Sequence, residues 1–181
     1  MDKKSLIIVI FLSLVVNNHI HAQNHNGFAS DVNSGLPVYF PLAKKDFLKM
    51  SSAFGSRYHP LQRKVKNHKG LDLVATLGKP VYASACGEVI TNDWHEGYGN
   101  RIILLHPNGV KTLYGHLMKS AVKVEQEVEG GQIIGYVGNT GQTTGPHLHY
   151  EIWVKSKKVD PIAFWNNMLS KQDSEHTNSK K

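Results

Sequence analysis

Residues 147–154, His-Leu-His-Tyr-Glu-Ile-Trp-Val, alternate polar and apolar side chains in a way that is typical of a β-strand. Successive side chains of a strand point to opposite faces, so His147 and His149 share one face and lie roughly 7 Å apart. The other face carries an apolar set that belongs in a core: Leu148, Tyr150, Ile152 and Val154. The segment therefore predicts a strand that packs one face on a core and turns two histidines toward a polar cleft.

Further apolar runs precede this strand at intervals of about ten residues and are separated by Gly, Pro and Asn. They lie at residues 80–90, 100–106, 111–117 and 131–138. This spacing predicts an all-β fold, an antiparallel β-sheet in a sandwich or barrel-like arrangement, rather than βαβ units. Few short helices are expected, the clearest at Pro161–Leu169. A weak similarity between residues 79–90 and 129–138 is compatible with two related halves.

The first 22 residues have the layout of a secretory signal peptide. Lys3 and Lys4 precede an apolar run at residues 6–16, and a polar stretch then ends at Ala22. Eleven residues are too few for a membrane-spanning helix, which needs roughly 20. We therefore expect cleavage after Ala22, export to the periplasm, cell envelope or extracellular space, and no stable membrane insertion afterwards. An uncleaved membrane tether is the alternative.

Removal of this segment leaves 181 − 22 = 159 residues, enough for one domain with its own core. Residues 23–50 are expected to form a polar leader, 23–35, and a domain-entry arm, 36–50, that can pack against the domain. The domain itself is expected at residues 51–165. Residues 166–181 are polar, and a disordered tail is predicted there.

The formal net charge of the whole chain is +7, but the lysines are scattered rather than arranged in a stripe. We interpret them as a solvated surface, and no motif predicts a nucleic-acid partner. Cys86 is the single cysteine, so no intramolecular disulfide can form, and we expect a small buried side chain there. The fold must then be stabilised by its core or by a metal. A monomer is expected.

A second group of polar residues is His68-Lys69-Gly70-Leu71-Asp72. In an extended chain its imidazole and carboxylate would be anchored roughly 13 Å apart, too far to share a cation at about 2 Å from each ligand. The chain must therefore bend, and Gly70 permits a bend that enters a strand.

His68, Asp72 and one of the pair His147/His149 would make a nitrogen and oxygen site with three ligands. Three protein ligands leave one position of a tetrahedral zinc site open for water, which is the catalytic pattern. Zinc lowers the pKa of bound water and polarises carbonyl groups, so hydrolysis is the expected chemistry. His116, in residues 113–117, Leu-Tyr-Gly-His-Leu, is a candidate base.

The motifs HKGLD (68–72), YGHL (114–117) and TGPHLHYEI (144–152), in this order, resemble the lysostaphin-type or LytM-like zinc endopeptidases of bacterial cell walls. The resemblance covers approximately Ser51–Ala163. It implies an antiparallel β fold with two related halves and one Zn²⁺ per chain. It also implies peptidoglycan peptides as substrates, either glycine-rich bridges or stem and cross-link bonds.

The roles that this resemblance implies fall on five positions of this sequence. His68, Asp72 and His149 would be the zinc ligands. His116 and His147 would be the catalytic histidines, acting on the attacking water as general base and by hydrogen bonding to the developing oxyanion.

Two other functions compete with this interpretation. A non-catalytic relative could bind peptidoglycan and activate another wall hydrolase, but such a protein is expected to have lost some of the five residues. A carrier or phosphotransfer domain with a similar β fold is disfavoured by export.

Overall fold

The computed structural model describes residues 35–59 and 64–178. The predicted signal peptide and nearly all of the polar leader lie outside the described residues. No helix in the described part of the chain has the length and apolar character that crossing a membrane requires.

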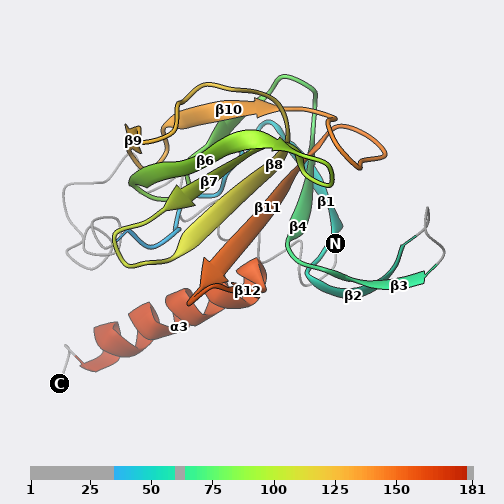
Figure 1. Cartoon of the computed structure of the whole chain (residues 1–181). Coiled ribbons are helices and arrows are strands. Elements are labelled where there is room, and N and C mark those ends of the chain that lie inside the picture. The colour runs from blue at the N-terminus through green and yellow to red at the C-terminus, as the bar shows by residue number, and fades with distance from the viewer. Residues whose placement is uncertain (1–34, 60–63, 179–181) are drawn as a thin grey trace.

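Twelve strands and one helix make up the described residues (Figure 1). They are β1 Phe47–Ser52, β2 Gly55–His59, β3 Lys64–His68, β4 Leu71–Ala75, β5 Pro80–Tyr82, β6 Gly87–His95, β7 Gly99–Leu105, β8 Lys111–Ser120, β9 Glu127–Val128, β10 Ile133–Val137, β11 His147–Val154, β12 Lys157–Val159 and α3 Pro161–Asn178.

Ten of the strands form one sheet, in which the main path runs β1-β4-β11-β8-β7-β6-β9. β10 pairs with β5 and β8, and β12 pairs with β11. The remaining two strands, β2 and β3, form a separate ribbon that projects from the sheet (Figure 1). Every strand pair is antiparallel, which confirms the predicted all-β fold class.

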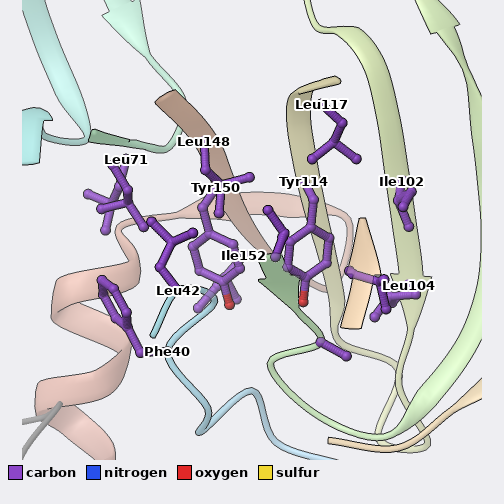
Figure 2. Packing of buried hydrophobic residues seen from close by; sticks show 14 of the residues in the cluster. Phe40, Leu42, Leu71, Ile102, Leu104, Tyr114, Leu117, Leu148, Tyr150 and Ile152 are labelled. Carbon is purple, nitrogen blue, oxygen red and sulfur yellow. The ribbon is translucent and has the colours of Figure 1, made fainter. Parts of the chain in front are cut away.

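The core lies on one face of β11 and its neighbours (Figure 2). Leu148, Tyr150 and Ile152 are fully buried there, as the alternation in β11 predicts. Burying an aliphatic side chain such as Leu148 or Ile152 stabilises a fold by roughly 1.5–3 kcal/mol. The opposite face of β11 is thereby fixed toward the polar side of the sheet.

The domain-entry arm takes part in this core. Phe40 and Leu42 are buried, and β1 pairs with β4 at the edge of the main sheet. The arm packs as expected, but the folded unit begins before the predicted boundary at residue 51. The sequence did not predict that residues 36–50 belong to the folded unit. Polar and apolar residues alternate irregularly in this segment, so it has no hydrophobic period that would indicate a strand or a helix.

α3 is longer than the predicted helix and extends through residues 166–178, where the sequence predicts a disordered tail. Its first turns are anchored because Trp165 is buried, stacks on Tyr150 at 5.8 Å between ring centroids, and donates from Nε1 to the carbonyl of Pro37. Residues 166–178 contain no Gly or Pro, so nothing in the covalent chain stops an anchored helix from continuing.

Candidate metal centre and catalytic groove

The predicted bend at Gly70 joins β3 to β4 and brings His68 next to Asp72. His68 is the last residue of β3, and Asp72 is the second residue of β4. A Cβ atom on Gly70 would lie 2.3 Å from the carbonyl oxygen of Tyr150 on β11. Glycine is therefore needed here chiefly because the bend passes directly against β11.

β11 lies between β4 and β8 and carries both histidines of the H-x-H pair. His149 stands opposite Asp72 on β4 and opposite Gly115 on β8. Since side chains alternate along β11, His147, His149 and Glu151 all project on the face away from the core. The register of β11 thus places His149 beside the carboxylate of Asp72.

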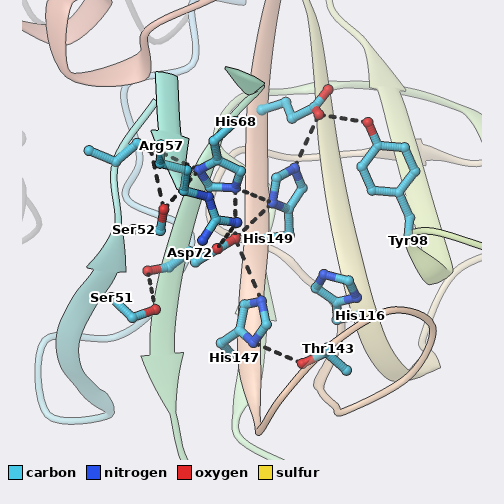
Figure 3. Close-up of polar contacts among 12 residues, drawn as sticks. Ser51, Ser52, Arg57, His68, Asp72, Tyr98, His116, Thr143, His147 and His149 are labelled. Carbon is cyan, nitrogen blue, oxygen red and sulfur yellow. Dashed lines mark hydrogen bonds and ion pairs between the residues drawn. The ribbon is translucent and has the colours of Figure 1, made fainter. Parts of the chain in front are cut away.

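Three atoms that could bind a metal ion converge at this point: His68 Nε2, Asp72 Oδ1 and His149 Nδ1 (Figure 3). His68 Nε2 lies 3.1 Å from Asp72 Oδ1 and 3.2 Å from His149 Nδ1, and His149 Nδ1 lies 2.8 Å from Asp72 Oδ1. All three residues are buried. Ligand atoms at about 2.0 Å from a tetrahedral zinc ion lie about 3.3 Å from one another, so the spacing suits such an ion.

Each of these three side chains is held from behind by a second contact. His68 Nδ1 donates to the carbonyl of Ala53 at 2.8 Å, and His149 Nε2 donates to Glu151 Oε1 at 3.1 Å. Arg57 Nη2 lies 3.4 Å from the outer oxygen of Asp72, Oδ2. Contacts of this kind orient the ligands in metal centres and fix the tautomer of each histidine.

These outer contacts leave three lone pairs facing one another. A carbonyl and a carboxylate only accept hydrogen bonds, so His68 Nδ1 and His149 Nε2 must carry the protons. In the neutral rings His68 Nε2 and His149 Nδ1 are then acceptors, pointed at each other and at Asp72 Oδ1. Three acceptors at hydrogen-bond distance require a cation or a proton between them. The donor set therefore fits Zn²⁺, which takes nitrogen and oxygen ligands.

The pKa shifts of Asp72 and His149 also indicate that the site favours a positive charge. Burial would raise the pKa of Asp72, but its close contacts with the imidazoles of His147, His149 and His68 outweigh burial and hold that pKa far below its usual range. Burial would lower the pKa of His149, yet Asp72 and Glu151 on its two sides raise it. Both shifts favour a carboxylate beside a bound positive charge.

His116 reaches the site through an irregularity in β8. Leu117 pairs with Asn100 and Tyr114 with Ile102, so two residues of β8 stand opposite one residue of β7. His116 lies in this bulge with φ +60°, a left-handed conformation that costs a non-glycine residue roughly 1–2 kcal/mol. Bulges commonly turn a side chain toward an active site.

His116 and His147 lie beside the three-atom cluster, with ring centroids 4.7 Å apart. His116 Nδ1 donates to the carbonyl of Thr140 at 2.7 Å, and His147 Nδ1 donates to the carbonyl of Gly145 at 2.8 Å. With the proton on Nδ1, Nε2 of each neutral ring is an acceptor, and Nε2 of His147 lies 3.5 Å from Asp72 Oδ1. Burial and the nearby His147 lower the pKa of His116 to about 4, so His116 is neutral at pH 7.

The cluster lies in a groove of about 590 Å³. One wall includes Arg57 and Lys66 of the β2–β3 ribbon, with Lys69 in the bend that follows β3. The other wall is the loop at residues 141–144, and the tip between β6 and β7 adds His95 and Tyr98. The groove thus gives a ligand access to the three converging side chains and to both neighbouring histidines, His116 and His147.

Sequence reasoning missed the residues that support this centre. Glu151 is fully buried and accepts hydrogen bonds from Tyr98, Trp153 and Lys158 as well as from His149. Burial would raise the pKa of Glu151, but His149 and Lys158 lower it to about 2, so it is ionised. Its place two residues after His149 on the same strand face was the signal available in the sequence.

Two histidines for which no role was predicted have different positions. His95 lines the groove, and its Nδ1 accepts from the backbone N–H of Gly97 at 3.0 Å. His106 is buried elsewhere, with Nδ1 at 2.7 Å from the carbonyl of Cys86 and Nε2 at 2.9 Å from the hydroxyl of Thr112. His106 is therefore a structural histidine, whereas His95 belongs to the rim of the groove. Cys86 itself is half-buried.

Comparison with known proteins gives close relatives. The chain is 44% identical over 117 residues to the DD-carboxypeptidase/endopeptidase Mpg of Neisseria meningitidis, a match that covers 65% of this chain and 27% of that protein. It is 43% identical over 115 residues to the peptidoglycan DD-endopeptidase ShyA of Vibrio cholerae, covering 63% and 27%. The chain thus spans about a quarter of the length of the curated relatives that it matches.

Solved structures with the same fold include a zinc-containing peptidase from Vibrio cholerae, with a TM-score of 0.64, 39% identity, and coverage of 68% of this chain and 38% of that chain. The catalytic domain of lysostaphin from Staphylococcus simulans has a TM-score of 0.60 and 34% identity, covering 65% and 92%. The family model described as peptidase family M23 matches residues 66–161. This range includes His68, Asp72 and His149 and both neighbouring histidines, and the comparisons confirm the predicted resemblance: the chain belongs to peptidase family M23.

Proposed function

We propose that this chain is a zinc-dependent endopeptidase that hydrolyses peptide bonds of bacterial peptidoglycan, in cross-bridges or stem peptides. The observation that carries the proposal is the convergence of three unprotonated ligand atoms in a groove, beside two histidines, His116 and His147, whose Nδ1 atoms are held by backbone carbonyl groups. The names of the relatives, which include peptidoglycan DD-endopeptidases, support the substrate class.

In this proposal His68, Asp72 and His149 hold one Zn²⁺ ion. Both His147 and His149 lie near Asp72 Oδ1, at 3.5 Å and 2.8 Å. The choice of His149 is supported by the 3.2 Å distance from its Nδ1 to His68 Nε2 and by the carboxylate of Glu151 behind its ring. When bound, the ion supplies Lewis-acid polarisation of the peptide carbonyl and lowers the pKa of a water molecule.

His116 and His147 would carry the proton and the developing charge. A neutral His116 can accept a proton from the attacking water at its free Nε2, and its lowered pKa keeps it available over a broad pH range. His147, on the adjacent strand, can hydrogen-bond to the developing oxyanion once its own Nε2 is protonated. Thr140 and Gly145 hold the two rings by their carbonyl groups, which reduces reorientation during the reaction.

The proposed site of action is the cell envelope or the space outside it. Peptidoglycan lies there, and the sequence layout of residues 1–22 predicts a signal peptide. All five functional side chains come from one chain, so we propose that the monomer is the working unit with one zinc ion. The prediction of no nucleic-acid partner stands with this proposal.

Two measurements on the purified protein test the proposal together. Metal analysis should find one zinc per chain, and mass spectrometry of digests of defined peptidoglycan fragments should find hydrolysed peptide bonds. The masses of the products would also name the bond that is cleaved. A protein that carries no zinc and leaves the fragments intact, yet binds peptidoglycan, would instead support the non-catalytic activator.

A further inference from the structure

The two long walls of the groove differ in charge. Residues 53–71, which include the whole β2–β3 ribbon, contain five Lys and Arg residues and no Asp or Glu: Arg57, Arg63, Lys64, Lys66 and Lys69. Three of these, Arg57, Lys66 and Lys69, line the groove. The facing loop wall at residues 141–144 is neutral, with the sequence Gly-Gln-Thr-Thr.

Arg57 and Lys66 stand directly opposite each other in the β2–β3 ladder. They belong to the same ribbon face as His68, since residues 66 and 68 share a side of β3. Like charges directly opposite in an antiparallel pair destabilise it. An anion bound between these two side chains would remove that cost.

The acidic side chains that line the groove are already engaged. Asp72 lies among the histidines of the metal cluster, and Glu151 is fully buried against His149 and Lys158. Among the described residues, Arg57 has an ion pair only with Asp72 Oδ2, at 3.4 Å, and Lys66 and Lys69 have none. Arg57 carries five N–H donors, so it can bind a second carboxylate while keeping this contact.

We propose that Arg57 and Lys66, with Lys69 at the rim, form a subsite for a free carboxylate of the substrate. This inference rests on the proposed function and narrows it. Stem peptides of peptidoglycan carry free carboxylates, whereas a glycine bridge is neutral along its length. The cationic ribbon therefore selects carboxylate-bearing stem peptides, with the planar guanidinium of Arg57 suited to bidentate binding.

The test is a binding measurement with two stem peptides that are not cross-linked. Because they contain no cross-link bond, binding is measured without cleavage of a cross-link. They differ only in that one has a free side-chain carboxylate and the other a carboxamide at the same position. Isothermal titration of the zinc-loaded full chain should give an affinity about fivefold higher for the carboxylate form, the effect of one partly screened ion pair. Lys66→Gln should remove most of that difference.

Lys123→Gln is the matched control, since Lys123 is exposed and is not among the groove residues. It should preserve the fivefold difference. Lys66 is preferred to Arg57 as the test position because Arg57 also contacts Asp72, so its replacement would disturb the metal cluster. Equal affinity for the two peptides, or no binding of either, would overturn the subsite.

Cleavage assays on cross-linked fragments separate this inference from the proposed function. Cleavage of carboxylate and carboxamide fragments with equal efficiency would overturn the subsite and leave the peptidase intact. Carboxylate-dependent binding that requires Lys66, without any cleavage, would support the subsite and overturn the peptidase. A different outcome is that the Lys66→Gln variant binds both peptides as the parent does but no longer binds a phosphodiester wall polymer. This result would show that the ribbon binds that polymer, and it would overturn the proposal.

Discussion

The imidazole of His149 and the carboxylate of Glu151 meet on the same face of β11, with Nε2 and Oε1 3.1 Å apart. Glu151 has no exposed surface and also accepts from Trp153 Nε1 at 2.6 Å and from the Tyr98 hydroxyl at 2.8 Å. The carboxylate of Glu151 is therefore fixed in position. It in turn orients the ring of His149, whose Nδ1 faces His68 Nε2 and Asp72 Oδ1.

Replacement of Glu151 by Gln should weaken zinc binding by roughly 10- to 100-fold, the usual effect of losing a contact behind a ligand. An amide can offer an N–H to His149 where the carboxylate only accepts, so the ring is less firmly oriented. Zinc affinity is measured by competition with a chelator of known affinity. Glu125→Gln, at an exposed position, is the control, and equal zinc affinity in both variants would contradict the prediction.

The two histidines of β11 should respond differently to the same substitution. His149→Ala should lose both zinc and hydrolysis, because its Nδ1 is one of the three converging atoms. His147→Ala should keep zinc and lose hydrolysis. Metal analysis and turnover of the two purified variants decide between them. Retention of zinc by His149→Ala at the parental level would show that the ligand assignment is wrong.

The strained backbone at His116 allows function and stability to be separated. His116→Ala and His116→Gly should both keep zinc and lose turnover. The glycine variant should be more stable by about 1 kcal/mol, because glycine adopts φ +60° without the steric cost that alanine has. Urea unfolding of the two variants gives this difference, and a more stable alanine variant would refute it.

His106 should make the stability of the fold depend on pH. Burial lowers its pKa from 6.5, so the unfolded chain takes up a proton more readily than the folded one. Above pH 6.5 His106 is neutral in both the folded and the unfolded chain, and its burial causes no loss of stability. The free energy of unfolding then decreases as the pH falls from 6.5 toward the lowered pKa of His106 in the folded protein. Urea unfolding of the zinc-free protein between pH 7.5 and 5 should show a steeper loss for the parent than for His106→Gln. Parallel curves would mean that His106 contributes nothing.

Much of the site could be predicted because its determinants are local in the sequence. The alternation in β11 assigned Leu148 and His149 to opposite faces, and the spacing of His68 and Asp72 required a bend where Gly70 lies. The contacts that hold these side chains in place could not be predicted in this way. Tyr98 is 53 positions from Glu151, and Arg57 reaches Asp72 only because the ribbon folds back, so both depend on pairing between distant strands.

The bulge at His116 and the length of α3 are further examples. A bulge is visible only when the register of both strands is known, and a polar helix is decided by whether its first turns are anchored. In this chain the anchor is Trp165 against Tyr150 and Pro37, from three separate parts of the sequence.

His68 and His149 are 81 positions apart, and their ring nitrogens lie 3.2 Å from each other. An ion bound to both residues would close a long loop of the chain. Such a link reduces the conformational entropy of the chain between the two residues, much as a disulfide does. With Cys86 as its single cysteine, this chain has no disulfide to do the same. Loss of the ion would then loosen the fold and stop the chemistry in one event.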